Sequence, residues 1–125
     1  MPRVRFGELG AIAPRSLFGL AVRWLQRSGE LPGLSAYHIT MPKGARHPPA
    51  YHKKRDELIF VLEGSGTLRV DRRRRRLKPG TIVHIPAGRI HEVTTGRGGL
   101  KVLSLFCPAM DPRSPDVHLA ETHGR

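Results

Sequence analysis

The sequence predicts an all-β fold, built from short antiparallel strands that form a sandwich or a barrel. The 14 Gly and 11 Pro residues are spread along the 125-residue chain and divide it into short apolar segments, as turns divide the strands of such folds. A chain of this length is close to the commonest size of one domain and too short for two. We therefore expect a single domain over residues 1–125, with a core barrel over about 16–107 and a surface tail over 108–125.

The first element, residues 14–26, fits a strand at least as well as a helix. Leu20, Val22 and Trp24 recur at every second position, which is the period of a strand, and Gly19 disfavours a helix here. Further strands are predicted at residues 34–41, 47–52, 57–63, 67–70, 74–78, 81–86, 91–95 and 100–106. The turns between them are rich in Gly and Pro, as at residues 42–44, 64–66, 79–80 and 96–99.

Two of the 7 histidines lie in contexts that suggest chemistry. His52 is followed five residues later by Glu57, at the start of an apolar strand. His91 follows a Pro-x-Gly turn at residues 86–88, which redirects the chain so that the next strand begins with an imidazole. Two neutral imidazoles and one carboxylate supply three ligands for a divalent transition metal.

These residues occur in two motifs that resemble those of the cupin superfamily. The first cupin motif reads Gly, five residues, His-x-His, three or four residues, Glu, six residues, Gly, and it falls here on Gly44, Ala50, His52, Glu57 and Gly64. The second reads Gly, five residues, Pro-x-Gly, two residues, His, three residues, Asn, and it falls on Gly80, Pro86, Gly88, His91 and Thr95. The short separation, residues 65–79, matches compact single-domain microbial members. The resemblance implies a jelly-roll-like antiparallel barrel of the double-stranded β-helix type.

The resemblance also implies a site and a range of functions. It implies that His52, Glu57 and His91 bind a divalent metal ion, which could be Fe, Mn, Ni, Cu or Zn, next to a small organic ligand. Such a protein could be an oxygenase, an isomerase or a lyase, and whether this chain is an enzyme stays open. The alternative is a non-catalytic binding or sensing module, in which the same three side chains form a metal-free hydrogen-bonded cluster.

The chain departs from the family pattern at two positions. Ala50 replaces the first metal-binding His of the family, and Thr95 replaces the frequent Asn. Two other histidines are candidates for a fourth ligand. His84 lies on the strand that leads into the Pro-x-Gly turn. His47 lies three residues before Ala50, so that strand periodicity points it away from the site unless the prolines between them break the register.

The net charge and the composition of the chain limit the kinds of partner that we expect. The 22 Lys and Arg residues against 10 Asp and Glu give a net charge of +12, which leaves a polyanion or nucleic-acid partner less expected but not excluded. The run from Arg72 to Arg76 must project into solvent, because an unpaired buried guanidinium is costly. No apolar run is long enough to span a membrane, and the N-terminus lacks the apolar region of a secretory signal, so we expect a cytoplasmic protein. Its single Cys permits no internal disulfide, which suits a reducing compartment. The family resemblance further implies a homodimer.

Overall fold

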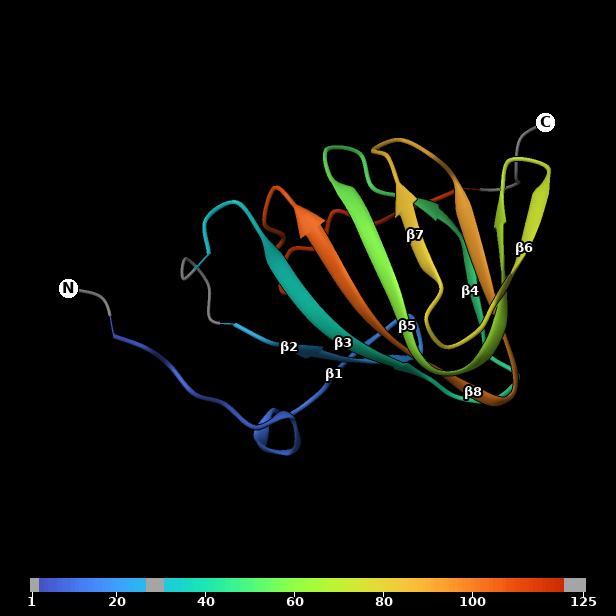
Figure 1. Cartoon of the computed structure of the whole chain (residues 1–125). Coiled ribbons are helices and arrows are strands. Elements are labelled where there is room, and N and C mark those ends of the chain that lie inside the picture. Colours follow the sequence, from blue (N-terminus) through green and yellow to red (C-terminus); the bar gives the residue numbers. More distant parts are fainter. Residues whose placement is uncertain (1–2, 27–30, 121–125) are drawn as a thin grey trace.

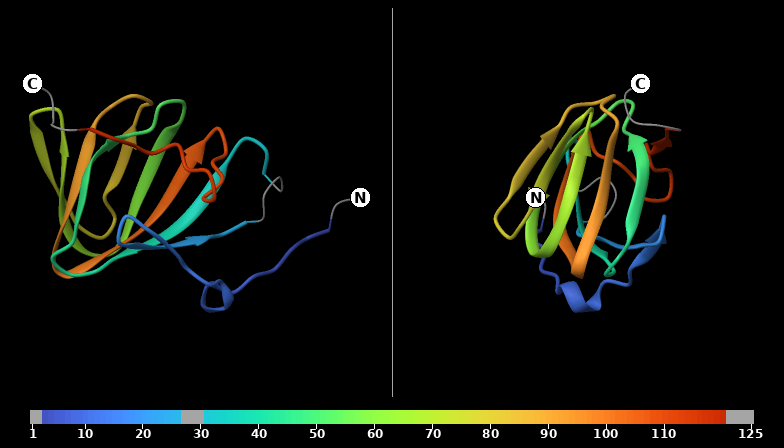
Figure 2. Two further views of the ribbon diagram at one scale, coloured as in Figure 1. Left: turned by 180° about the vertical axis from the view of Figure 1, so that it is seen from behind. Right: turned by 90° about the vertical axis from the view of Figure 1, so that its right-hand side faces the viewer.

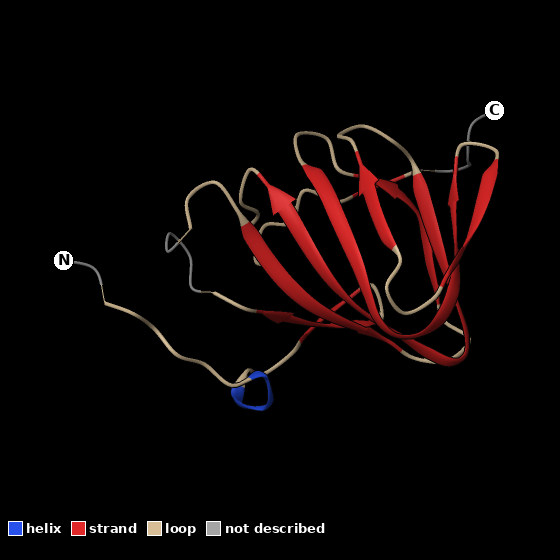
Figure 3. Cartoon of the chain, in the orientation of Figure 1, coloured by secondary structure: helices blue, strands red, loops and turns tan. Residues whose placement is uncertain are grey.

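The computed structural model describes residues 3–26 and 31–120, and strands dominate it (Figures 1 and 3). Its one short helical turn is a 3₁₀ segment, η1, at Leu9–Ala11. The strands are β1 Arg15–Leu17, β2 Leu20–Trp24, β3 Ser35–Met41, β4 Arg46–Tyr51, β5 Asp56–Val70, β6 Arg73–Leu77, β7 Ile82–Ile85, β8 His91–Cys107 and β9 His118–Leu119. The predicted all-β class and the cupin-like antiparallel barrel are therefore confirmed.

The described strands form one antiparallel sheet that curls over on itself (Figure 2). Its main path runs in the order β1-β2-β3-β8-β4-β9, while β5 pairs with β8 on one side and with β6 and β7 on the other. Both β5 and β8 are long enough to take part in the two halves of the barrel. Through these two long strands, the two halves of the barrel form one continuous sheet.

Four of the predicted strands form only two long strands in the structure. Residues 57–63 and 67–70 are both parts of β5, and residues 91–95 and 100–106 are both parts of β8. The two long strands stay paired through register shifts near Gly64, which has a φ of 86°. A Cβ at this position would lie 2.1 Å from the Gly99 carbonyl oxygen. The glycine is therefore required by the close approach of the two strands at their bend, where the sequence alone suggested a turn.

The N-terminal element is a β-hairpin. β1 and β2 pair antiparallel and are joined at Phe18 and Gly19, both of which have positive φ angles, 52° and 78°. β2 then pairs with β3. The strand alternative for residues 14–26 is thus the correct one, because Gly19 supplies a tight turn and not a helical residue.

Strand alternation decides what faces the barrel interior. On β5, Glu57, Ile59 and Val61 are buried, whereas the intervening Leu58 and Phe60 are each about 40% exposed. The core cluster draws on most strands and consists of Leu20, Val22, Tyr37, Met41, Ile59, Val61, Leu68, Leu77, Ile85, Leu100, Val102, Phe106 and Met110. A carboxylate that points into the barrel from an apolar strand destabilises the fold unless polar groups contact it. Glu57 therefore needs polar groups beside it inside the barrel.

The arginine run lies at the edge of the sheet. Arg73 to Arg76 occupy β6, which pairs only with β5, and all five arginines from Arg72 onward are exposed. The predicted solvent exposure of this run is confirmed. Leu77, the last residue of β6, is 1% exposed. The strand therefore runs from solvent at Arg73 to the barrel core at Leu77.

The segment after Pro108 does more than run over the surface. Met110 and Pro112 are buried, and β9 pairs with the end of β4. This segment lies against the barrel and contributes to its interior. In the part of the chain that the structure describes, no helix has the length and apolar character needed to span a membrane.

Candidate metal centre

Three buried side chains meet inside the barrel. His52 follows the end of β4, Glu57 is the second residue of β5, and His91 is the first residue of β8. One potential ligand atom from each lies within 4.8 Å of those of the other two. His52 Nε2 is 3.0 Å and His91 Nε2 is 3.5 Å from Glu57 Oε1. The structure thus brings together the three residues that the sequence motifs singled out.

Each of the two imidazoles also contacts a backbone carbonyl group through its Nδ1 atom. His52 Nδ1 lies 2.8 Å from the Asp116 carbonyl oxygen, and His91 Nδ1 lies 3.0 Å from that of Arg89. A carbonyl only accepts, so each Nδ1 carries the hydrogen and donates it. In the neutral imidazole the lone pair is then on Nε2, the atom that faces Glu57 in both cases. This is the arrangement in which histidine usually binds metals.

A turn ties the two motifs together. Gly88, with a φ of 86°, belongs to the Pro-x-Gly turn, and its N–H donates to the His52 carbonyl oxygen at 2.7 Å. The positive φ favours glycine at this point. The turn therefore fixes the start of β8, and with it His91, against the segment that carries His52.

Glu57 is fully enclosed and has a second polar partner. Its Oε2 accepts a hydrogen bond from the hydroxyl of Ser104, which is 0% exposed. Burial alone would raise the pKa of Glu57, but the hydrogen bond from His52 and the charges of His52 and His91 outweigh burial and hold this pKa below its usual value. The carboxylate is therefore ionised and available as a ligand at neutral pH.

The two imidazoles differ in their response to Glu57. Burial would lower the pKa of His52, but the hydrogen bond and negative charge of Glu57 outweigh it and raise this pKa above its usual value. Burial lowers the pKa of His91, and Glu57 compensates only in part. In the metal-free protein, the hydrogen bond of 3.0 Å between His52 Nε2 and Glu57 Oε1 holds a proton between the two side chains. A divalent cation would replace that proton and meet three donors of the type that Fe, Mn, Ni, Cu and Zn accept.

The site opens onto a cavity of about 100 Å³ with mostly apolar walls. For comparison, an engineered apolar cavity of about 150 Å³ holds one benzene molecule. The His52 and Phe106 rings pack in a T-shaped arrangement, with their centroids 4.8 Å apart. The polar side chains on the walls are those of Tyr37, His47, His52, Glu57 and His91. The space beside the three donors is therefore smaller than a benzene-sized cavity, which limits a ligand enclosed there to a molecule smaller than benzene.

His47 lies in this cavity, against the expectation from strand periodicity. In the pairing of β4 with β8, His47 is opposite Val93 and Ala50 is opposite His91, so three steps on β4 match two on β8. This bulge at the two prolines reverses the parity and turns both positions inward. Burial lowers the pKa of His47, so that it is neutral at pH 7. Its ring nitrogens are not part of the three-donor group.

The suggestion that His84 is a fourth ligand is wrong. On β7 the inward positions are Val83 and Ile85, and His84 points outward with a side chain that is 59% exposed. Its Nε2 lies 2.9 Å from an oxygen of Asp56. Alternation along the strand, which could not be carried from the sequence alone, settles its direction.

The two departures from the family pattern have different structural consequences. Ala50 is 0% exposed and directly opposite His91, so its Cβ lies on the same face as the three donors. Thr95 does not belong to the donor group; its hydroxyl accepts from the Ala45 N–H and donates to the Pro42 carbonyl oxygen, both at 2.7 Å. The first departure removes a potential ligand, whereas the second anchors a turn.

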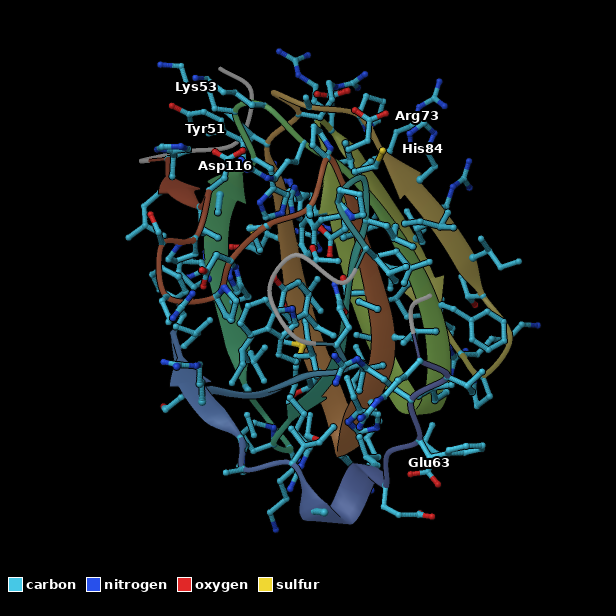
Figure 4. The ribbon with its side chains drawn as sticks, turned by 90° about the vertical axis from the view of Figure 1, so that its left-hand side faces the viewer. Tyr51, Lys53, Glu63, Arg73, His84 and Asp116 are labelled. Atoms are coloured by element: carbon cyan, nitrogen blue, oxygen red, sulfur yellow. The ribbon has the colours of Figure 1, made fainter. Side chains whose placement is uncertain are left out.

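Two contributors to the site were missed in the sequence analysis. Ser104 shares the inward parity of Val102 and Phe106, so a lone hydroxyl on the buried face of an apolar strand was a usable signal. Asp116 gave no such signal. Its side chain, 8% exposed, accepts from the Lys53 and Lys54 N–H groups at 3.0 and 2.9 Å, while its carbonyl group holds His52. Figure 4 shows Asp116 and Lys53 at the same end of the barrel.

Comparisons with known proteins identify the same family as the two sequence motifs. A family model described as Cupin domain matches residues 37–106. Quercetin 2,3-dioxygenase of Bacillus subtilis (strain 168) is 30% identical over 69 residues, which are 55% of this chain and 20% of that protein. The chain thus spans a fifth of that relative's length.

Solved structures share the fold. The polyketide cyclase RemF from Streptomyces resistomycificus superposes with a TM-score of 0.79 at 20% identity, over 96% of this chain and 87% of that one. A predicted oxalate decarboxylase from Thermotoga maritima superposes with a TM-score of 0.76 at 15% identity, over 84% of this chain and 100% of that one. At these identities the likeness concerns the fold alone.

Proposed function

The chain belongs to the cupin family, and from that premise we propose that it binds one divalent transition metal on His52, Glu57 and His91 and presents it to a small organic ligand. The observation that carries the proposal is the convergence of the two Nε2 atoms on Glu57 Oε1 while each Nδ1 is held by a backbone carbonyl. A divalent cation between three acceptors that face one another would satisfy all three at once.

The proposed activity is that of an oxygenase, isomerase or lyase on a small oxygen-bearing molecule. A bound transition metal supplies Lewis-acid or redox chemistry. The apolar walls exclude water from the ligand, which strengthens every polar contact inside the cavity. His47 and Tyr37 are the polar wall residues outside the donor group; the Tyr37 hydroxyl donates to the Met110 carbonyl oxygen, which leaves the His47 ring as the group suited to orient the ligand. The name of one relative in sequence, a dioxygenase, lies within this range of reactions.

A metal-free binding module is the second candidate, and one observation favours it. Ala50 leaves the site with three donors, and the proton shared by His52 and Glu57 already satisfies two of them. A protein of this kind would be stabilised by its ligand without turning it over. The metal titration described next separates the two candidates.

Ala50→His should tighten divalent-metal binding by about tenfold or more. Its Cβ already faces the donor group, so an imidazole there can add a fourth coordination bond. The measurement is calorimetric titration of chelator-stripped native and variant protein with Zn, Mn, Ni and Fe(II). Unfolding midpoints of both metal-free proteins serve as the control for overpacking of the buried position. If native protein binds none of the four metals and the variant gains nothing, the metal-free candidate replaces this proposal.

We also propose that the protein is a homodimer. Leu58, Phe60 and Leu62 are each about 40% exposed on the outer face of β5, and Ile82, opposite Phe60, is 65% exposed. Such an apolar patch on a sheet face is typical of an interface. Equilibrium sedimentation should give twice the 13.9 kDa of the chain, and Phe60→Asp should shift it to the monomer. A native protein that sediments as a monomer at micromolar concentration would refute the dimer.

The cytoplasm remains the proposed location. Cys107, the single cysteine of the chain, is exposed and unpaired. A free exposed thiol persists best in a reducing compartment.

A further inference from the structure

A second concave site lies between β6 and β7, which pair with different parts of β5. It is a groove of about 500 Å³, with Arg73 and Arg75 on one wall and Arg89 close by. His84, which points away from the metal centre, is also part of its wall, and Figure 4 shows it near Arg73. None of the three metal-donor residues lines this groove.

The groove carries uncompensated positive charge. Arg89 pairs with Asp71, and His84 pairs with Asp56. The side chains of Arg73 and Arg75, whose backbones pair with β5, have no ion pair or hydrogen bond with any residue in the described ranges, 3–26 and 31–120. Two guanidinium groups thus project into one groove with their donors unused. Each can bind a carboxylate or a phosphate through two parallel hydrogen bonds.

The floor of the groove is apolar, which sets it apart from a merely charged surface. Arg73 is opposite Val70 and Arg75 is opposite Leu68, so these two arginines share the inward face of the sheet with apolar side chains. Val83 and Ile85 of β7 complete the floor. Arg74 and Arg76 are opposite Arg69 and Thr67, on the other face of the same strand.

We propose that this groove binds a small organic anion, with its carboxylate or phosphate on Arg73 and Arg75 and its apolar body on the floor formed by Leu68, Val70, Val83 and Ile85. The arginine run therefore has two parts. Alternate residues serve the groove, and the others keep the exposed edge strand in solvent. The proposal is independent of metal loading, because the groove shares no donor with the metal centre.

The test is NMR and calorimetric titration of chelator-stripped protein with phenyl phosphate, benzoate, inorganic phosphate and benzyl alcohol. We expect both aromatic anions to bind, inorganic phosphate to bind at least about fivefold more weakly than phenyl phosphate, and the neutral alcohol not to bind. Methyl signals of Leu68, Val70, Val83 and Ile85 should shift in the native protein. Absence of binding, or shifts confined to cavity residues such as Met110, would overturn the proposal without bearing on the metal.

A pair of double variants with equal charge provides the control. Arg73→Ala with Arg75→Ala should weaken phenyl phosphate binding by at least about tenfold. Arg74→Ala with Arg76→Ala removes the same charge from the other face and should change it by less than about twofold. Equal loss in both would mean that the hairpin attracts anions without a specific groove. If a DNA duplex binds and the small anions do not, the surface is a nucleic-acid interface and the proposal is wrong.

Discussion

Glu57→Gln should weaken divalent-metal binding by about a hundredfold or more. Glutamine keeps the shape of the side chain and can still accept from Ser104, but it removes the one negative charge among the three donors. The loss of that charge should also lower the pKa of His52, which Glu57 raises in the metal-free protein. Calorimetric titration measures the affinity, and NMR titration of the His52 ring measures the pKa.

Glu63→Gln is the matched control on the same strand. Glu63 is exposed and lies 3.3 Å from Lys101 in a surface ion pair, so this change should leave both measurements as they are in the native protein. A Glu57→Gln protein that binds metal as tightly as the native one would show that the carboxylate is not a ligand. Equal losses in the two variants would point to a general effect of charge.

Asp116→Ala should destabilise the protein by roughly 2–4 kcal/mol and weaken metal binding by about tenfold. The buried carboxylate accepts from two backbone N–H groups, from Arg55 at 3.3 Å and from His118 at 2.8 Å, and all four donors lose their acceptor. Because the Asp116 carbonyl group holds His52, release of this segment frees the imidazole to turn. Chemical denaturation of metal-free protein measures the first effect and titration the second.

The difference in free energy of unfolding between the native protein and Asp116→Ala should depend on pH, and its sign follows from the pKa of Asp116. Burial would raise the pKa of Asp116, but hydrogen bonds from the Lys54 and Lys53 N–H groups, His118 and Arg55 outweigh it and hold this pKa well below the ordinary value of about 3.9. A depressed pKa contributes stability that is complete above the unfolded-state pKa and is lost as the pH falls towards the folded-state value. The gap between native and variant should therefore be full at pH 6 and shrink below about pH 4.

Asp111→Ala is the control for this segment. Asp111 is partly exposed and pairs with Arg113, whose hydrogen bond lowers its pKa to about 2. Removing it should leave the unfolding midpoint and the metal affinity unchanged. Should Asp116→Ala behave like Asp111→Ala in both respects, the segment has no role in holding His52.

Local sequence signals were sufficient for the strands and for the three-donor group. Period-2 alternation and Gly-Pro turns are properties of a few neighbouring residues, and they located nearly every strand. The positions of His52, Glu57 and His91 followed from motif spacing, because each lies close to a strand end whose course the family shares. The break near Gly64 was misread as a turn, because a close approach between two strands and a turn both require glycine.

What the sequence could not provide depends on pairing between distant segments. The inward direction of His47 results from a bulge against β8, and no alternation rule reports a bulge. The contact of Asp116 with His52 spans 64 positions and joins a short, polar segment to the site. His84 was open to either direction until the register of β7 against β5 fixed it.

Anomalous X-ray scattering from crystals of native protein, purified without chelator or added metal, tests the central claim most directly. The absorption edge found by fluorescence identifies the element, and data on both sides of that edge locate it. We expect one strong peak between His52 Nε2, His91 Nε2 and the Glu57 carboxylate. If no peak appears there even after soaking with Zn, Mn, Ni and Fe(II), and the His52–Glu57 hydrogen bond is intact, the cavity is not a metal centre.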